Sequence, residues 1–262
     1  MAPVASSAAP VVADAGVAEA PPAPVDVVSE AAAPDPTPAP TVRFRAPVKG
    51  QIVPVAKAGD FEIKLEVSHW NTAPDDKHVH VILDNRPYVA IYDTGKPIKL
   101  SRLLQGEKLS EGHHVLVAFP SRATHESVKT DGAFAIAEFF VGKKGPPSVD
   151  TAKPMLIYSR PKGPYEGDKA SRILIDFYLS RVALAPGKER VRITVKGPGI
   201  DSEKVVTAER FGPPFYLVNP QDGTYTVRAE LVGSDGKPIA GTWNDTSRTI
   251  TVLKEGTAPA HH

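Results

Sequence analysis

One strand sequence occurs twice in this chain, and this repeat limits the possible folds more than any other feature. Residues 112–119 read Gly-His-His-Val-Leu-Val-Ala-Phe, and residues 223–231 read Gly-Thr-Tyr-Thr-Val-Arg-Ala-Glu-Leu. Both copies follow an acidic residue, Glu111 or Asp222, and then alternate with a period of two, as half-buried strands do. They start 111 positions apart (223 minus 112), the size of one all-β domain. We therefore predict two similar β-modules in tandem.

The repeat also predicts which side chains are buried, because alternate residues of a strand share one face. The residues expected in the two cores are Val115, Val117 and Phe119 in the first copy, and Tyr225, Val227 and Ala229, or their neighbours, in the second.

Composition divides the 262 residues into five parts. Residues 1–42 contain 13 Ala and 9 Pro with no aromatic residue, Lys or Arg, so they bury too little apolar surface to offset the entropy of ordering. We expect this Ala/Pro-rich leader to be a disordered tether. Residues 43–144 form module 1, residues 145–153 a Gly/Pro-containing linker, residues 154–255 module 2, and residues 256–262 a disordered tail.

Apolar alternation and turn dipeptides predict short strands throughout both modules. In module 1 the expected strands are Phe61–His69, His78–Leu83, Tyr88–Tyr92, Gly112–Pro120 and Ala133–Val141. In module 2 they are Met155–Ser159, Arg172–Leu179, Arg190–Lys196, Lys204–Thr207, Phe215–Val218, Thr224–Val232 and Thr249–Leu253. The predicted fold class is all-β, with two tandem immunoglobulin/fibronectin-like β-sandwiches after the disordered leader.

Charge and cysteine content exclude several classes of protein. The absence of cysteine rules out disulfides, thiolate metal sites and cysteine nucleophiles. The net charge of +1 combines −5 in the leader with +6 spread thinly over the rest, so no basic cluster predicts a nucleic-acid partner. The apolar runs are shorter than the roughly 18 residues that span a bilayer.

Three stretches resemble a group of uncharacterised bacterial envelope proteins, lipoprotein-like chains with tandem immunoglobulin-like β-sandwich modules. They are residues 85–93 (Asn-Arg-Pro-Tyr-Val-Ala-Ile-Tyr-Asp), residues 118–129 (Ala-Phe-Pro-Ser-Arg-Ala-Thr-His-Glu-Ser-Val-Lys), and residues 158–163 with residues 173–179. The group has Pro-Trp where this chain has Ala123-Thr124, so an aromatic platform is missing there. The resemblance implies a sandwich fold and an envelope location, without an assigned activity.

Six of the eight histidines lie in module 1 and form the first candidate site. His78 and His80 lie at i and i+2 on one strand face, where two imidazoles can reach one ion. A third ligand is expected from His69, His125 or the His113/His114 pair. The alternative is that His78 and His80 are polar residues on a solvent-exposed face.

The second candidate is the loop that contains Ser121, Arg122, His125 and Glu126. Ser, His and Glu side by side suggest a hydrolase, but the chain lacks a Gly-x-Ser-x-Gly elbow and a glycine-rich oxyanion loop. We expect no catalytic residues, and interpret the stretch as a loop that contacts a ligand or partner.

Aromatic residues form a third candidate, a stacking platform for a glycan. The rings considered are Trp70, Tyr88, Tyr92, Tyr158, Tyr165 and Trp243.

The leading interpretation is a non-enzymatic, exported envelope protein without a cofactor, which binds a protein partner or envelope assembly. Long Ala/Pro tracts commonly tether a domain to a membrane, so we expect a periplasmic or cell-surface location, held through an N-terminal lipid anchor that has been removed from this sequence. The alternatives are a periplasmic copper- or zinc-binding protein that uses the module 1 histidines, and a glycan-binding accessory module.

Overall fold

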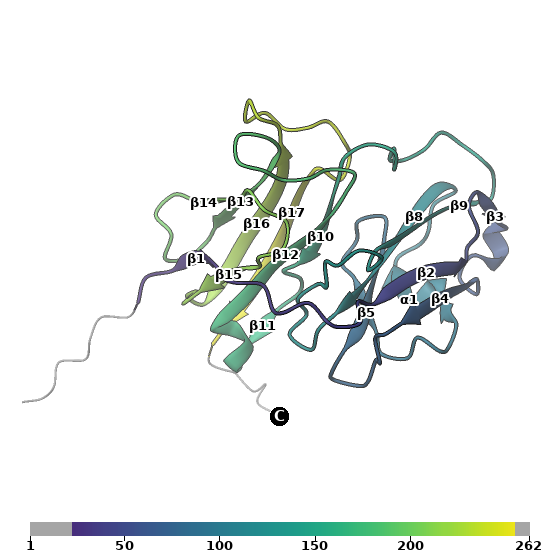
Figure 1. Cartoon of the computed structure of the whole chain (residues 1–262), viewed down its shortest axis with the longest axis horizontal. Coiled ribbons are helices and arrows are strands. Elements are labelled where there is room, and N and C mark those ends of the chain that lie inside the picture. Colours follow the sequence, from purple (N-terminus) through teal and green to yellow (C-terminus); the bar gives the residue numbers. More distant parts are fainter. Residues whose placement is uncertain (1–22, 255–262) are drawn as a thin grey trace, which may run out of the picture.

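The chain forms two β-sandwiches side by side, described by a computed structural model over residues 23–254 (Figure 1). Module 1 contains β2 (Thr41–Ala46), β3 (Gln51–Val53), the 3₁₀ turn η1 (Val55–Lys57), β4 (Glu62–Ser68), β5 (His78–Leu83), β6 (Val89–Ile91), β7 (Ile98–Lys99), α1 (Leu100–Leu104), β8 (Gly112–Ser121) and β9 (Ala135–Val141). Module 2 contains β10 (Met155–Arg160), β11 (Tyr165–Glu166), the 3₁₀ turn η2 (Gly167–Ala170), β12 (Arg172–Ser180), β13 (Arg190–Lys196), β14 (Lys204–Ala208), β15 (Phe215–Val218), β16 (Gly223–Val232) and β17 (Asp245–Leu253).

The two modules have the same topology. In module 1 the sheets are β2-β4-β7 and β3-β9-β8-β5-β6, and in module 2 the corresponding orders are β10-β12-β15 and β11-β17-β16-β13-β14. Even the short parallel pairs match, since β3 pairs with β9 as β11 pairs with β17. Leaving out the short strands β3 and β11, each module has seven strands in chain order. The first, second and fifth form one sheet, and the third, fourth, sixth and seventh form the other, which is the arrangement of an immunoglobulin/fibronectin-like sandwich. The predicted fold class of two tandem sandwiches is confirmed.

The repeated strands β8 and β16 occupy equivalent central positions, but the predicted core register is wrong for β8. Leu116 and Ala118 face the core of module 1, as Val227 and Ala229 face the core of module 2. The predicted residues Val115, Val117 and Phe119 are fully buried on the opposite face of β8. Alternation identified the two faces correctly, but both are apolar in β8 because module 2 covers the outer one.

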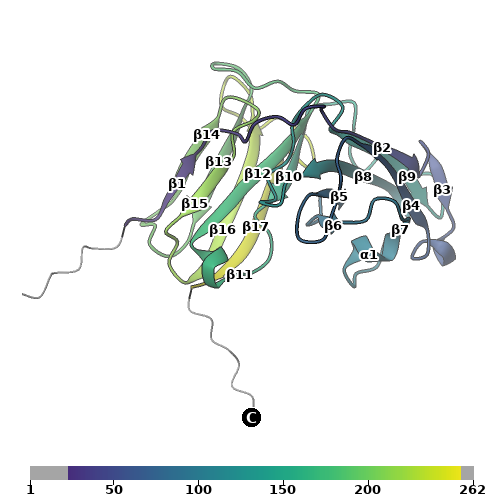
Figure 2. The ribbon, with the colours of Figure 1, turned by 60° about the horizontal axis from the view of Figure 1, so that its bottom comes forward.

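A third apolar core joins the modules. On one side lie Ile82, Tyr88, Val115, Val117 and Phe119, and on the other Val149, Met155, Ile157, Tyr178 and Trp243. The outer face of the larger module 1 sheet therefore packs on the β10–β12 side of module 2, as the two views show (Figures 1 and 2). The expected linker is part of this contact, because Val149 is buried in it.

The Ala/Pro-rich leader is not a free tether over the residues that the structure describes. Asp26–Ser29 form β1, which pairs antiparallel with β15 at the edge of a module 2 sheet. The chain then passes along both sandwiches to β2 of module 1, so a segment before module 1 in sequence belongs to module 2 in space (Figure 2). The expected disorder is therefore wrong for residues 23–42. Residues 1–22, and the expected tail at 256–262, lie outside the described residues.

Packing and pairing explain why this segment is ordered in spite of its composition. The Val25 and Val27 side chains are buried in the module 2 core. Ion pairs link Asp26 to Lys204 and Glu30 to Arg172. Two valines and an unpaired strand edge thus provide interactions that an Ala/Pro count does not reveal.

Each repeated strand is fastened at its start by a ring hydrogen-bonded to the preceding turn. The Tyr225 hydroxyl donates to the Pro198 carbonyl at 2.7 Å and accepts from the Gln221 amide at 2.8 Å, a tyrosine corner. At the matching position of β8, His114 Nε2 donates to the Ser110 carbonyl at 2.9 Å. The repeat thus extends to the way each strand is anchored.

No helix within residues 23–254 has the length and apolar character needed to cross a membrane.

Candidate functional site

Three histidine rings of module 1 converge at the junction of the two modules. The Nε2 atoms of His78 and His80 lie 3.0 Å apart, and Nδ1 of His125 lies 3.0 Å from Nε2 of His78. One ring nitrogen from each residue falls within 4.8 Å of the others. In a tetrahedral zinc site with Zn–N bonds of 2.0–2.1 Å, ligand nitrogens are about 3.3 Å apart. Two of the three nitrogen pairs are therefore close to the spacing of ligands on one metal ion, and the third pair lies within 4.8 Å.

The sheet and one turn bring the rings together. His78 and His80 point to the same side of β5, and β8 pairs beside it. After β8 the chain turns through residues 122–126, where Arg122 and Glu126 form a backbone hydrogen bond. His125 has a φ of +68° in this turn. This left-handed conformation, which His adopts more readily than most residues, returns the chain so that the His125 ring meets β5.

Neighbouring groups fix how two of the rings carry their protons. His78 Nδ1 donates to the Asp76 carbonyl at 2.7 Å, which leaves the Nε2 lone pair facing the cluster. His80 Nδ1 lies 3.3 Å from the Ser159 hydroxyl, which projects from module 2 where the β10–β12 register shifts. Because a hydroxyl can donate or accept, Ser159 allows His80 Nε2 either to donate to His78 or to present a lone pair. Such outer hydrogen bonds orient metal-ligating histidines.

Burial keeps the cluster neutral. The His78 and His80 side chains are almost completely buried, so the alternative of a solvent-exposed face is wrong. Burial, reinforced by the charges of His78 and His125, holds the pKa of His80 well below its ordinary value. Burial and then the Arg160 charge lower the pKa of His125 to about 3, and burial likewise lowers that of His78. At neutral pH all three rings are unprotonated, the form that binds metals.

The other histidines that the sequence suggested lie elsewhere. His69 is exposed and within 3.2 Å of the Ala39 carbonyl. His113 contacts Ser148 and Glu138, and His114 contacts Asp84 and Ser110. Of the proposed third ligands, only His125 joins His78 and His80.

The predicted partner loop contacts the leader of this same chain. Arg122 donates to the Ala33 and Pro34 carbonyls, and the Glu126 carboxylate accepts from the Ala33 amide. The buried Ser121 hydroxyl donates to the Arg122 carbonyl and not to His125. Ser121, His125 and Glu126 therefore do not form a Ser-His-Glu catalytic relay. Arg122 and Glu126 thus hold the leader, and His125 belongs to the histidine cluster.

The aromatic rings do not form an exposed platform. Trp70, Tyr88, Tyr158, Tyr165 and Trp243 are buried, and Tyr92 is half-buried beside His78. Tyr88 stacks on His80 with ring centroids 3.5 Å apart, and its hydroxyl lies 3.2 Å from His125 Nδ1. These rings therefore support the cluster and the cores.

Module 2 contributes basic residues that sequence analysis did not select. Arg160 lies over the Tyr88 ring at 5.3 Å, and Lys162 Nζ is 3.9 Å from the centroid of that ring. Arg160 and Lys162 lie in residues 158–163, a segment that carries part of the family resemblance. The segment contains no sequence motif that predicts a binding site. Their place beside His125 arises only from the contact between modules.

No family model matches this sequence, and no curated protein matches it. Among solved structures, the fibronectin(III)-like modules of Clostridium thermocellum CbhA are 16% identical, with 85% of this chain and all of that chain covered and a TM-score of 0.28. A two-domain fibronectin type-III segment of chicken tenascin is 10% identical over 81% of this chain and 99% of its own, with a TM-score of 0.25. The D0-D1 domain of intimin is 12% identical over 81% and 97%, with a TM-score of 0.26. At these scores the likeness carries no functional argument.

Proposed function

We propose that this protein binds a transition-metal ion, Cu²⁺ or Zn²⁺, through His78, His80 and His125. The observation that carries the proposal is the convergence of three neutral ring nitrogens with neighbours 3.0 Å apart. Neutral imidazole is a preferred ligand of both ions. We propose a binding role and not a catalytic one, since the Ser121 hydroxyl donates to the Arg122 carbonyl and not to His125.

Metal binding requires the other neutral tautomer of His80, with its proton on Nδ1 instead of Nε2, and no net loss of a proton. Without metal, His80 Nε2–H donates to His78 Nε2 while the Ser159 hydroxyl donates to His80 Nδ1. With a metal bound, the Ser159 hydroxyl would accept from His80 Nδ1–H, and all three inward nitrogens would present lone pairs.

Nearby cations oppose the ion and limit its affinity. Arg160 and Lys162 lower the pKa of the histidines for the same reason that they repel a bound cation. An anionic ligand in the remaining coordination position would offset this repulsion.

Thermal unfolding with added Zn²⁺ or Cu²⁺ tests the proposal. The full chain should carry His261→Ala with His262→Ala, because adjacent histidines can bind metal weakly. At a hundredfold excess over the dissociation constant, one bound ion should raise the melting temperature by about 5–10 °C. His78→Ala with His80→Ala should abolish the shift, and the control His69→Ala should retain it. No shift in the parent, or an equal shift in the double variant, would refute the proposal.

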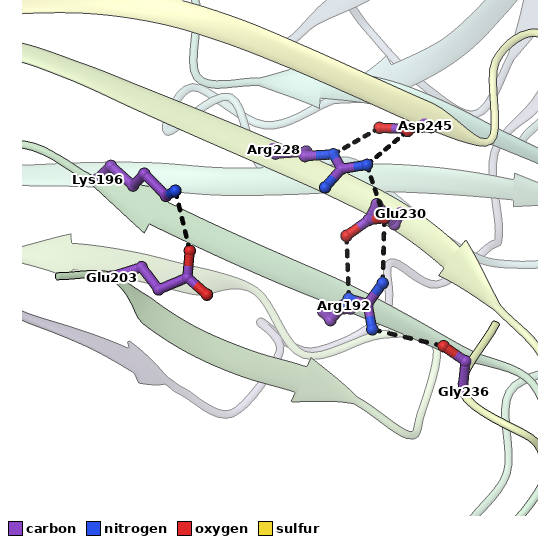
Figure 3. Close-up of polar contacts among 7 residues, drawn as sticks. All are labelled: Arg192, Lys196, Glu203, Arg228, Glu230, Gly236 and Asp245. Carbon is purple, nitrogen blue, oxygen red and sulfur yellow. Dashed lines mark hydrogen bonds and ion pairs between the residues drawn. The ribbon is translucent and has the colours of Figure 1, made fainter. Parts of the chain in front are cut away.

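A second candidate function is binding of a protein partner through the outer face of module 2. When the repeated strands are aligned on Gly112 and Gly223, Thr226, Arg228 and Glu230 of β16 are the equivalents of three β8 residues that dock on module 2. Those β8 residues are Val115, Val117 and Phe119. This face carries a charged network in which Glu230 pairs with Arg192 at 2.9 Å and with Arg228 at 2.9 Å, and Arg228 pairs with Asp245 (Figure 3). Module 1 thus uses this face for docking, whereas in module 2 the face presents the partly exposed Arg192 and Arg228 around the buried Glu230.

The envelope location belongs to this second candidate, and it rests on the leader composition and the family resemblance. Pull-down from envelope fractions should capture the same protein with the wild type and not with Arg192→Ala plus Arg228→Ala. Capture that is unchanged by the double substitution would exclude this face as the binding surface.

A further inference from the structure

A groove at the module junction opens beside His125 and has walls from both sandwiches. Its volume is about 920 Å³, at the upper end of the range for small-molecule sites. Module 1 contributes Tyr92, Thr124 and His125, and module 2 contributes Arg160, Lys162 and Lys169, among others. Neither module alone forms it.

The charge of this groove is strongly unbalanced. Its lining contains Arg160, Lys162, Lys169 and Arg172, with Asp75 as the acidic residue. Arg172 is neutralised by the leader residue Glu30. Across residues 23–254, no salt bridge engages the other three cations. Cations gathered without counter-charges in a groove favour an anionic ligand.

The donors at the groove are only partly used. Arg160 donates from one terminal nitrogen to the Tyr165 hydroxyl at 3.0 Å, while its buried Nε–H has no partner among the described residues. Lys162 Nζ makes one hydrogen bond, to the Tyr88 carbonyl at 2.8 Å. Burial, and then the charges of Arg160 and Arg248, lower the pKa of Lys162 to about 8, which shows how strongly the site disfavours its own positive charge.

We propose that this groove binds a small organic anion whose phosphate or carboxylate group is held by Arg160 and Lys162, with Lys169 at the mouth. Guanidinium and ammonium donors form strong charge-assisted hydrogen bonds to such groups. The groove is larger than an inorganic ion needs, and Pro87, Tyr92 and Pro164 line it with surfaces for an uncharged body of sugar size. The proposal does not depend on a bound metal.

Calorimetric titration of the metal-free full chain tests this proposal. The probes are glucose 6-phosphate and citrate, which distinguish a phosphate from a carboxylate ligand, with inorganic phosphate and glucose for comparison. We expect one probe with an organic body to bind at one site more tightly than inorganic phosphate, and glucose not to bind. Arg160→Gln should weaken binding by about tenfold or more.

Two further variants separate recognition from folding and from general charge. Lys169→Gln alters an exposed side chain and should weaken binding severalfold at an unchanged melting temperature. Lys143→Gln removes an exposed lysine outside the groove and should leave binding unchanged. Equal weakening by both substitutions, or the absence of binding to every anion in the wild type, would overturn the proposal. Because zinc and copper are left out, failure here does not bear on the histidine site.

Discussion

Lys129 of module 1 and Asp176 of module 2 form an ion pair with an Nζ–Oδ1 distance of 2.6 Å, and both side chains are at most 9% exposed. The Asp176 carboxylate also accepts hydrogen bonds from the Ser127 amide and hydroxyl. One buried carboxylate of module 2 therefore satisfies three donors of module 1.

Asp176→Ala should destabilise the protein by about 3–5 kcal/mol, because it leaves the Lys129 charge buried without a partner. Chemical denaturation measures this change. Asp93→Ala, which breaks an exposed pair with Lys96, is the control and should cost at most about 1 kcal/mol. Equal effects of the two substitutions would show that the cross-module pair is solvated.

Charges placed on opposite faces of β8 should have different consequences. Leu116→Asp puts a carboxylate into the module 1 core and should unfold that module. Val117→Asp puts it into the core between modules and should first separate them, at a cost of about 3 kcal/mol or more. Small-angle scattering would detect elongation, and circular dichroism would report the retained strands. Loss of all strand signal in Val117→Asp would contradict this assignment of faces.

The leader strand should stabilise module 2. Val27→Asp places a charge at a position that is 6% exposed in the module 2 core, so it should release β1 and lower the melting temperature. Limited proteolysis should then cut residues 30–40 faster than in the wild type. Val55→Asp, at a position 53% exposed, is the matched control. An unchanged melting temperature in Val27→Asp would restore the interpretation of the leader as a free tether.

Acid should destabilise the metal-free protein through the histidine cluster. The pKa of His125 is lowered to about 3, and those of His78 and His80 are lowered as well. Below the ordinary histidine pKa of about 6.5 the unfolded chain binds more protons than the folded one, so the free energy of unfolding falls as pH falls from there. His125→Gln should reduce the slope of unfolding free energy against pH between about 6.5 and 4. His69→Gln, outside the cluster, should not reduce it, and equal slopes in all three proteins would contradict this origin.

The sequence supports local conclusions better than those that depend on the contact between modules. The seven strands expected in module 2 all form, because alternation and turn residues act over a few positions. Alternation shows which residues share a face but not what covers that face. It therefore predicts the wrong core for Val117, and it cannot decide whether His78 is buried or exposed to solvent. The His78/His80 pair follows from spacing, but Arg160 lies 80 positions from His80 (160 minus 80), and no local pattern connects them.

The pairing of β1 with β15 has a consequence for synthesis on the ribosome. Asp26 pairs with Val218, 192 positions later (218 minus 26), so at usual elongation rates the first strand waits about 10–40 s for its partner. Module 1 can complete its own sheets in that interval, whereas the leader remains open to any other strand edge. The earliest strand of the described chain thus pairs only after most of module 2 has been made, which makes this edge the place where two nascent copies would most readily exchange strands.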